Sequence, residues 1–318
     1  MRVVADIGGT NARFARFDPD RGISAIAHYR CADFPSLEDA VRYYATTQEI
    51  TATALAVAIA APVTGEVVSM SNGPWQVHCQ QLAKSLGLQK LLLINDFTAQ
   101  ALAHGPVQTS RAKLIREGKE TVRAPLLVYG PGTGLGVAAA IPTETGWLPL
   151  ETEGGNVLLS PLNAVEDGIL QALRKQQAAV IAEEVLSGRG VLNLYRHFAT
   201  AADPQLEAPE QVTLADAQGL PAAMKAVDQF FAFLGQHVGD AALSLGCWQG
   251  VVLTGGIIPQ LEKRLLNSPF LERLNNRGRY SELMRSIPVW VSSDADAGLR
   301  GAAMALDNSY LQHRVICR

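Results

Sequence analysis

Two glycine-rich turns in the sequence could hold a phosphate group, and the first of them follows an acidic residue. Asp6-Ile7-Gly8-Gly9-Thr10-Asn11 ends an apolar run with an acid and continues with two glycines and a hydroxyl. Glycines permit positive φ angles and let backbone N–H groups come close to an anion. An acid beside a phosphate makes chemical sense when a metal ion lies between them. An ordinary hairpin turn has the same composition, so this turn alone does not decide.

The second turn contains more glycine. Gly130-Pro131-Gly132-Thr133-Gly134-Leu135-Gly136 has four glycines among seven residues and lies between two apolar segments. It lacks the Gly-Lys-Ser/Thr ending of a P-loop. It also does not lead into a helix as the Gly-x-Gly-x-x-Gly motif of a dinucleotide-binding fold does. We therefore predict a hairpin loop that cradles phosphate with its backbone donors.

Three acidic positions could act on a hydroxylated substrate. Asn95-Asp96 follows a buried apolar run and begins a helix-like segment, where the carboxylate could take the proton of a hydroxyl group. Glu153, which precedes Gly154-Gly155, and Glu183 could accept hydrogen bonds from other hydroxyls, and such a set suits a polyol. Each position also has a purely structural interpretation, because an N-cap Asp needs no further function and a helical Glu is usually solvated.

Other chemistries have no motif in the sequence. The six histidines are scattered without metal-ligand spacing, and the four cysteines are widely spaced with no Cys-x-x-Cys pair. No Gly-x-Ser-x-Gly sequence marks a hydrolase nucleophile. A zinc site, a disulfide scaffold and a Ser-His-Asp hydrolase are therefore not indicated.

The elements that must position these residues alternate along an α/β chain. Strands are expected at residues 3–6, 12–17, 24–30, 54–60, 91–95, 126–129, 135–141 and 289–291. Ser36 is expected to cap a helix that reaches about Tyr44, since Asp39 lies at the capping-box position. Further helices are expected at residues 96–104, over much of 161–198 and 221–246, and at 297–306.

The two halves of the chain form a weak internal repeat. Each opens with strand, glycine turn and strand, and each later has an apolar strand that ends at a turn: Leu93-Ile94-Asn95-Asp96 and Leu253-Thr254-Gly255-Gly256. Two copies of one α/β unit facing each other would place these turns around a shared cleft, where a ligand would bind. We expect a smaller domain of residues 1–106 plus about 292–318 and a larger one of about 107–291. The charged stretch at 105–125 is interpreted as a solvated crossover rather than a patch that steers anions.

Composition limits the function classes. The 318 residues are enough for about two domains, and 48% hydrophobic content with 18% charged residues excludes a disordered chain. A net charge of −3 argues against a nucleic-acid binder that works through bulk positive charge. No apolar run has the length of a membrane span, and Asp6 interrupts the N-terminal apolar stretch, unlike in a signal peptide. We expect a cytoplasmic enzyme without nucleic-acid or membrane partners.

In this order and spacing, the motifs resemble those of the bacterial glucokinases of the hexokinase/actin/heat-shock ATPase superfamily. The resemblance covers nearly the whole chain and rests on two phosphate motifs, two sugar-side segments, a catalytic motif and an adenosine motif. These are Asp6-Ile7-Gly8-Gly9-Thr10-Asn11-Ala12-Arg13 and Gly132-Thr133-Gly134-Leu135-Gly136, Ala61-Pro62-Val63-Thr64-Gly65 and Ser71-Asn72-Gly73-Pro74-Trp75, Ile94-Asn95-Asp96-Phe97-Thr98-Ala99, and Leu253-Thr254-Gly255-Gly256-Ile257. It implies a two-domain, duplicated actin-like ATPase (ribonuclease H-like) fold with an interdomain cleft.

The resemblance also implies an activity, which is ATP-dependent phosphorylation of glucose at its 6-hydroxyl, with Asp96 as the base. The sugar would be bound by Asn72, Asn95, Asp96, Glu153, Asn156 and Glu183. ATP would be bound by Asp6, Gly8, Gly9, Thr10, Asn11, Gly132, Thr133, Gly134, Gly255 and Gly256. Mg²⁺ would lie near Asp6, directly or through water. A homodimer is left open.

One residue departs from the family pattern. The family usually has Glu-Gly-Gly-His where this chain has Glu153-Gly154-Gly155-Asn156. The family histidine contacts sugar hydroxyls near the anomeric carbon, and asparagine is shorter, although it still offers a donor and an acceptor. A kinase for another hexose or an amino sugar is therefore the alternative. A sugar-binding regulator without turnover ranks third, because the cysteine cluster of the related repressor family and an N-terminal DNA-binding segment are both absent from this sequence.

Overall fold

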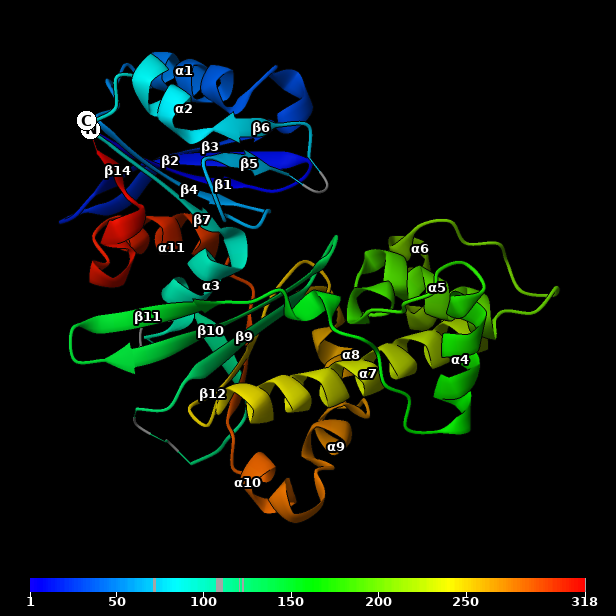
Figure 1. The fold of residues 1–318 in the computed structure, drawn as a ribbon. Helices are drawn as coiled ribbons and strands as arrows, with labels where there is room; N and C mark the ends of the chain where they lie inside the picture. Colours follow the sequence, from blue (N-terminus) through cyan, green and yellow to red (C-terminus); the bar gives the residue numbers. More distant parts are fainter. Residues whose placement is uncertain (71–72, 107–110, 120, 122, 318) are drawn as a thin grey trace. The chain divides into compact units, whose positions relative to one another are not determined.

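The structure is a computed structural model that describes residues 1–70, 73–106, 111–119, 121 and 123–317. The chain forms two compact units (Figure 1). Unit 1 comprises Met1–Ser110, Ala140–Glu151 and Asp294–Arg318, and unit 2 comprises Arg111–Ala139 and Thr152–Ser293. Among the described residues, no helix is both long and apolar enough to cross a bilayer.

Unit 1 is built on a six-stranded sheet with the order β14-β7-β4-β1-β2-β3. Its strands are β1 (Arg2–Ile7), β2 (Asn11–Asp18), β3 (Gly22–Arg30), β4 (Ala54–Ile59), β7 (Lys90–Asn95) and β14 (Ile316–Cys317). The pairs β1–β4 and β4–β7 are parallel, whereas β1–β2 and β2–β3 are antiparallel hairpins. The strands β5 (Val67–Ser69) and β6 (Gln76–His78) pair with each other as a separate two-stranded sheet. All the strands expected in this half of the sequence are present.

Helices cover both faces of this sheet. Alternate residues of β1 point to opposite sides, and because most of these residues are apolar, both faces must be buried. Val3, Ala5 and Ile7 pack with α1 (Leu37–Thr47) and α2 (Cys79–Ser85). Val4 packs in a separate cluster with α3 (Asp96–His104) and α11 (Ala297–Leu306). As predicted, the Ser36 side chain caps α1 by accepting from the Asp39 N–H at 3.2 Å.

The second sheet has the order β11-β10-β9-β12-β13-β8. Its strands are β8 (Ala112–Arg116), β9 (Leu126–Pro131), β10 (Leu135–Thr143), β11 (Gly146–Glu151), β12 (Gly250–Leu253) and β13 (Val289–Ser292). The strand β10 begins in unit 2 and ends in unit 1, which also contains β11. The pairs β9–β12 and β12–β13 are parallel, and β13–β8 is antiparallel.

The two strand orders show the internal repeat directly. Aligning β3-β2-β1-β4-β7-β14 with β11-β10-β9-β12-β13-β8 matches each strand to one counterpart. This alignment corrects one detail of the sequence interpretation. The strand before Gly255-Gly256 is β12, whose counterpart is β4, whereas the strand before Asp96 is β7, whose counterpart is β13. The two apolar motifs are therefore not equivalent positions of the repeat.

The charged stretch near residue 115 was interpreted as a solvated crossover, and that interpretation was wrong for residues 112–116. These residues form β8, which pairs with β13 at the edge of the sheet. The Arg116 guanidinium packs within unit 2, where it donates to the Ile287 carbonyl at 3.0 Å and to Asn275 Oδ1 at 2.7 Å. Burial lowers the pKa of Arg116 to about 10. The sequence analysis missed this edge strand because its charged residues resemble those of a solvated loop, although the Arg116 side chain is partly buried.

Helices make up most of the remainder of unit 2. They are α4 (Ala164–Arg174), α5 (Gly188–Phe198), α6 (Pro209–Ala217), α7 (Pro221–Leu245), α8 (Glu262–Leu266), α9 (Phe270–Asn275) and α10 (Ser281–Arg285). The helical stretch expected at 161–198 is thus two helices, separated at 175–187. The apolar stripe of α7, with Phe230, Phe231 and Leu234, is fully buried in the core as expected.

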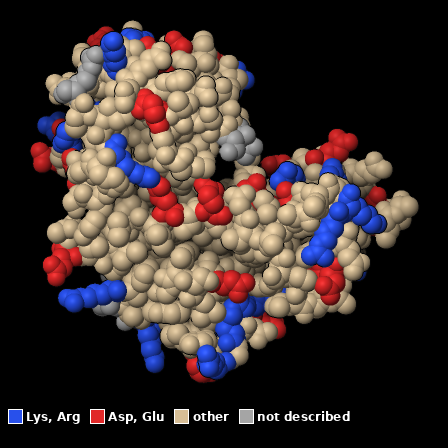
Figure 2. All heavy atoms as spheres, in the orientation of Figure 1, with Lys and Arg blue, Asp and Glu red and all other residues tan. Residues whose placement is uncertain are grey.

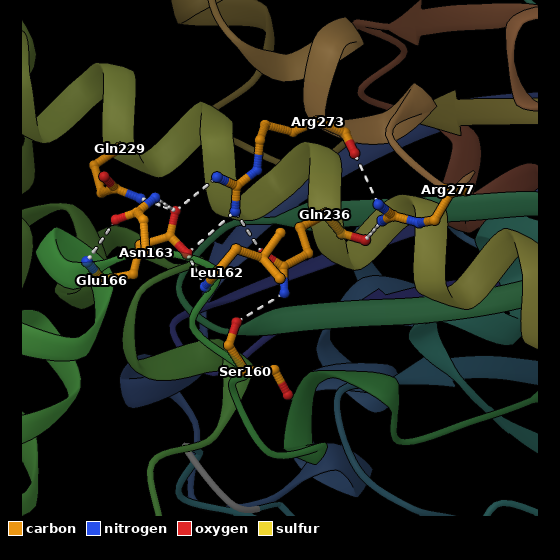
Figure 3. Close-up of polar contacts among 8 residues, drawn as sticks. All are labelled: Ser160, Leu162, Asn163, Glu166, Gln229, Gln236, Arg273 and Arg277. Atoms are coloured by element: carbon orange, nitrogen blue, oxygen red, sulfur yellow. Dashed lines mark hydrogen bonds and ion pairs between the residues drawn. The ribbon is translucent and has the colours of Figure 1, made fainter. Parts of the chain in front are cut away.

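A buried ionic network, which we call the Glu166 network, ties α4, α7 and α9 together (Figure 3). The Glu166 carboxylate is wholly buried and lies 2.8 Å from Arg273 Nη1. Arg273 also donates to Gln236 Oε1 at 2.6 Å, and Arg277 donates to the Gln236 carbonyl. Charged groups inside a core need such partners, because an unpaired buried charge is strongly unfavourable.

The unit boundaries differ from the expected domain limits in one segment. Residues 140–151 belong to unit 1, although their position in the sequence suggested the other domain. The reason is packing: β11 lies against α3, and Asn308 donates to the Trp147 carbonyl at 2.8 Å. These are long-range contacts that no local pattern reveals.

Candidate active site

In unit 1, the candidate residues gather at the carboxyl ends of three parallel strands. The register pairs Asp6 of β1 with Ala58 of β4, and it pairs Ala58 with Ile94 of β7. Asp6 and Asn95 therefore lie at the same edge of the sheet, on two strands that are separated by β4. In open α/β sheets, ligands bind outside the carboxyl ends of parallel strands. The fold thus places the first phosphate motif and the catalytic motif where a ligand is expected.

Asn95 caps the helix that Asp96 begins. Asn95 Oδ1 accepts from the backbone N–H groups of Phe97 at 2.8 Å and Thr98 at 3.2 Å. Asp96 Oδ1 accepts from the same Phe97 N–H at 3.0 Å. The amide nitrogen of Asn95 lies 3.4 Å from the Ala61 carbonyl, in a sugar-side segment. The cap is Asn95 rather than Asp96, so the structural interpretation of Asp96 as an N-cap does not apply.

The Asp96 carboxylate is partly exposed at the positive end of α3. Such a position favours a negative charge. A group of this kind can take a proton from a hydroxyl when one is bound within hydrogen-bond distance.

Asp6 is half-buried near the end of β1. Its side chain is 17% exposed and is 3.4 Å from Arg13 Nη1, which also donates to the Ala295 carbonyl at 2.7 Å. Burial raises the pKa of the Asp6 carboxyl, the guanidinium of Arg13 opposes that shift, and Asp296 adds to it. A bound cation would therefore stabilise the charged form of Asp6.

The first glycine turn joins β1 to β2 beside Asp6. It is closed by a hydrogen bond from the Gly8 N–H to the Asn11 carbonyl at 2.9 Å, and the Thr10 carbonyl accepts from Cys31 N–H at 2.8 Å. Thr10 and Asn11 are exposed at its tip, and Gly9 is half-buried. The predicted phosphate-binding residues of this motif thus lie on one turn.

In unit 2, the second glycine turn contacts the predicted adenosine motif. The Gly132 N–H donates to the Gly134 carbonyl at 2.8 Å, which leaves Thr133 exposed at the tip. Gly255 follows β12 with φ +86°, a conformation that suits glycine, and a Cβ there would collide with the Pro131 carbonyl. A Cβ on Gly132 would lie 3.7 Å from the Gly256 nitrogen. The five glycine-motif residues predicted for this side of ATP are therefore neighbours.

Glu183 lies against the same turn. Its Oε2 accepts from the Leu135 N–H at 2.9 Å, and its Oε1 is 3.8 Å from Arg189 Nη2. A Cβ on Gly134 would come within 2.7 Å of Oε2. The structure thus places this carboxylate, predicted for the sugar, beside the residues predicted for ATP.

Glu153 and Asn156 form a short exposed turn after β11. The Asn156 N–H donates to the Glu153 carbonyl at 2.9 Å, and Asn156 Nδ2 donates to Glu153 Oε2 at 3.3 Å. Gly155 packs its backbone onto the Leu135 carbonyl, so this turn lies close to the second glycine turn. Asn156 is therefore an exposed residue whose side chain contacts the predicted sugar-binding glutamate.

Two further points concern the predicted set. Asn72 lies outside the described residues, so its predicted role stays a prediction. Among the described residues, no group of three or more His, Cys, Asp and Glu side chains could hold a metal ion by itself. Any bound Mg²⁺ would therefore need ligands from a nucleotide and from water.

Comparisons with known proteins decide the family. A profile described as Glucokinase matches residues 3–309. The chain belongs to the glucokinase family. A curated glucokinase of Neisseria meningitidis is 41% identical over 313 residues, which are 96% of this chain and 95% of that protein. Another, from Chromohalobacter salexigens, is 38% identical over 96% of this chain and 97% of its own length.

The solved structures agree with this assignment. The crystal structure of a glucokinase from an Antarctic psychrotroph is 32% identical and superimposes with a TM-score of 0.84, covering 97% of this chain and 99% of that one. The predicted glucokinase family, its α/β actin-like ATPase fold and its kinase activity are thereby confirmed. The roles of the individual residues stay predictions.

Several residues near the site were not predicted from sequence. Arg13 stands in a motif that the sequence analysis quoted, but nothing local indicated its ion pair with Asp6. Glu151 and Arg314 also lie beside the first turn of α3, where Glu151 binds the Thr98 hydroxyl, and both come from distant parts of the chain.

Proposed function

We propose that this protein transfers the γ-phosphoryl group of ATP to the 6-hydroxyl of glucose, giving glucose 6-phosphate and ADP. The match to the glucokinase profile over residues 3–309 carries the proposal. The position of Asp96 at the start of α3 and the exposed tips of the two glycine turns support it.

Asp96 is the base in this proposal. As the bond between the 6-oxygen and the γ-phosphorus forms and the bond from that phosphorus to the bridging oxygen of ADP breaks, the hydroxyl proton passes to Asp96. Asn95 contributes by capping α3, which fixes the direction in which the Asp96 side chain leaves the helix. Phosphoryl transfer depends on such positioning more than on covalent chemistry by the protein.

ATP is held by backbone donors and one carboxylate. The turns at 8–11 and 132–134 offer N–H groups to the phosphates, and Gly255-Gly256 leaves room for the adenosine. Asp6 fits a magnesium complex of ATP, because Mg²⁺ is commonly bound by one or two carboxylates, substrate phosphates and water. When bound, Mg²⁺ supplies neutralisation of phosphate charge.

The sugar is bound by the polar side chains of Asn72, Asn95, Asp96, Glu153, Asn156 and Glu183. The carboxylates accept hydrogen bonds from its hydroxyls, and the amides can both donate and accept. Closing around the sugar would exclude water and so limit hydrolysis of ATP.

A second candidate, a kinase for another hexose or an amino sugar, is favoured by Asn156. Its side chain already bonds Glu153, so it has less freedom to reach a hydroxyl than an unengaged side chain would have. A sugar-binding regulator without turnover is the third candidate.

A coupled assay of ADP release over a panel of hexoses separates the three. Glucose-dependent release with the highest kcat/KM for glucose supports the proposal. Preference for another sugar supports the second candidate, and sugar binding without ADP release supports the third.

The proposal includes a cytoplasmic location, a small-molecule sugar as substrate, and no nucleic-acid or membrane partner. The net charge is −3, and basic and acidic side chains are mixed on the face shown in Figure 2. A homodimer stays a prediction that a sedimentation measurement would test.

A further inference from the structure

Three side chains of unit 1 connect segments that surround the start of α3, and we call them the Glu151 network: Thr98, Glu151 and Arg314. We propose that Glu151 and Arg314 are positioning residues, which act through Thr98 and the loop 61–65 to hold Asp96 and the sugar-side loop in their productive geometry. This inference rests on the proposed function.

The contacts are specific. Arg314 Nη1 donates to Glu151 Oε1 at 2.6 Å and Arg314 Nη2 donates to Oε2 at 2.9 Å. Glu151 Oε1 also accepts from Thr98 Oγ1 at 3.0 Å. A guanidinium that binds both carboxylate oxygens fixes direction as well as distance. The carboxylate of Glu151 is therefore held in one orientation toward Thr98.

Thr98 transmits this constraint to the base. It is fully buried in the first turn of α3, two residues after Asp96, and its backbone N–H is bound by the Asn95 cap. Its hydroxyl has no access to solvent, so loss of the Glu151 oxygen would leave a buried donor without a partner. Such a loss is costly enough to shift the turn that carries Asp96.

The same network holds the predicted sugar-side segment 61–65. Arg314 Nη2 donates to the Val63 carbonyl at 3.3 Å, while Asn95 Nδ2 donates to the Ala61 carbonyl at 3.4 Å. The loop is thus bound at two carbonyls, one by the helix cap and one by the network.

Glu151 also lies at a boundary of the chain. It is the last residue of its segment in unit 1, and Thr152 is the first residue of the next segment in unit 2. Thr152 Oγ1 donates to the Val137 carbonyl of unit 2 at 2.7 Å. Two successive side chains therefore fix the chain separately in each unit, immediately before the predicted sugar ligand Glu153.

The test uses Arg314→Gln and Thr98→Val, which remove the guanidinium and the hydroxyl with modest changes in size. Because a misplacement of about 1 Å can lower a rate about 100-fold, we expect kcat for glucose phosphorylation to fall about 10- to 100-fold in Arg314→Gln, with a raised KM for glucose. The KM for ATP should stay within about twofold. Thr98→Val should lower kcat, and combining the two changes should cost no more than the larger single effect, since both break one network.

Asp307→Asn is the matched control. Asp307 pairs with Arg2 at 2.5 Å and, like Arg314, binds the C-terminal segment to an earlier part of unit 1, but among the described residues it bonds no candidate site residue. It should leave kcat and KM within about twofold of wild type. Arg314→Lys, which keeps the charge but cannot form the two-point contact, should recover part of the lost kcat.

Amide hydrogen exchange gives a readout independent of turnover. Exchange at the Phe97 and Thr98 N–H groups should be faster in Arg314→Gln than in Asp307→Asn. Unchanged exchange there, or kcat values equal to the control despite lower thermal stability, would overturn the positioning role. A wild-type protein that does not phosphorylate glucose would instead overturn the proposed function, and the exchange result would still decide the positioning claim.

Discussion

The Glu151 network of unit 1 and the Glu166 network of unit 2 use the same chemistry in different surroundings. Each pairs one glutamate with one arginine and adds neutral hydrogen-bond partners (Figure 3 shows the second). Glu166 is wholly buried and Arg273 is 13% exposed, whereas Glu151 and Arg314 are 30% and 26% exposed. The first pair thus lies at a site edge and the second lies inside a core.

This difference in exposure predicts that the Glu151 network affects catalysis and that the Glu166 network affects stability. Removing one partner of a buried pair leaves a charge without compensation and destabilises the fold, whereas a partly solvated pair loses less because water replaces the partner. A network near solvent can therefore adjust the geometry of Asp96 at small cost in stability. The Glu166 network mainly fixes the packing of α4, α7 and α9.

The largest expected effect lies beyond both networks, at the base that the Glu151 network serves. Asp96→Asn should lower kcat by about 10²- to 10⁴-fold, the usual contribution of general-base catalysis, while glucose affinity changes less. Steady-state kinetics and calorimetric titration with glucose measure the two quantities. Near-normal turnover would show that Asp96 is not the base.

Breaking the Glu166 network should give the opposite pattern. Arg273→Met should lower the free energy of unfolding by about 3–5 kcal/mol because Glu166 loses its ionic partner in the core. Denaturant unfolding measures this change. At temperatures where the variant is folded, its kcat should match that of wild type. The double variant Glu166→Leu with Arg273→Met should be more stable than Arg273→Met alone, since it removes the unpaired charge.

Acidification should also affect the core beside the Glu166 network. Burial, with a contribution from Arg277, lowers the pKa of His237 in α7 to about 4. The ordinary histidine pKa in the unfolded chain is about 6.5, so between these values the unfolded state binds the extra proton. The free energy of unfolding should therefore fall as the pH decreases from about 6.5 to 4, by at most about 1.4 kcal/mol per pH unit for this group.

The control for this pH effect is His237→Gln, which should reduce the slope of that part of the pH profile while kcat at neutral pH is retained. An unaltered profile would mean that His237 is not the group responsible. His104→Gln in unit 1 is the matched variant. Burial also lowers the pKa of His104 to about 4, so His104 contributes to the pH dependence of the free energy of unfolding with the same sign.

Local patterns were enough to predict the elements that carry the candidate site. The helix Asp96–His104 was predicted with the bounds observed, because a buried strand precedes it and the helix-breaking Gly105 follows it in the sequence. The glycine turns were predicted for the same reason, since backbone conformation depends on neighbouring residues.

The rest depends on contacts between distant residues. Arg314 and Glu151 are 163 residues apart, and no periodicity connects them. The edge strand β8 was missed because its charged residues resemble a loop, and the wrong pairing of β7 with β12 in the repeat arose because only strand order in the sheet shows which strands correspond. Neither unit boundary at residues 140 and 151 has a local signal.

The smallest expected effect concerns specificity. Asn156→His should lower the KM for glucose about two- to tenfold, which corresponds to one hydrogen bond to an uncharged hydroxyl, and should change kcat little. It should leave unfolding unchanged, unlike the Glu166 network variant. If the wild-type protein prefers another hexose and Asn156→His reverses that preference, Asn156 sets the sugar specificity.

Phosphorus NMR of the purified protein with ATP, Mg²⁺ and glucose tests the central claim most directly. The account predicts a glucose 6-phosphate signal that grows in equal amount with ADP, and a rate lower by about 10²-fold or more in Asp96→Asn. Formation of ADP with inorganic phosphate alone, or glucose 6-phosphate formed at the wild-type rate by Asp96→Asn, would contradict it.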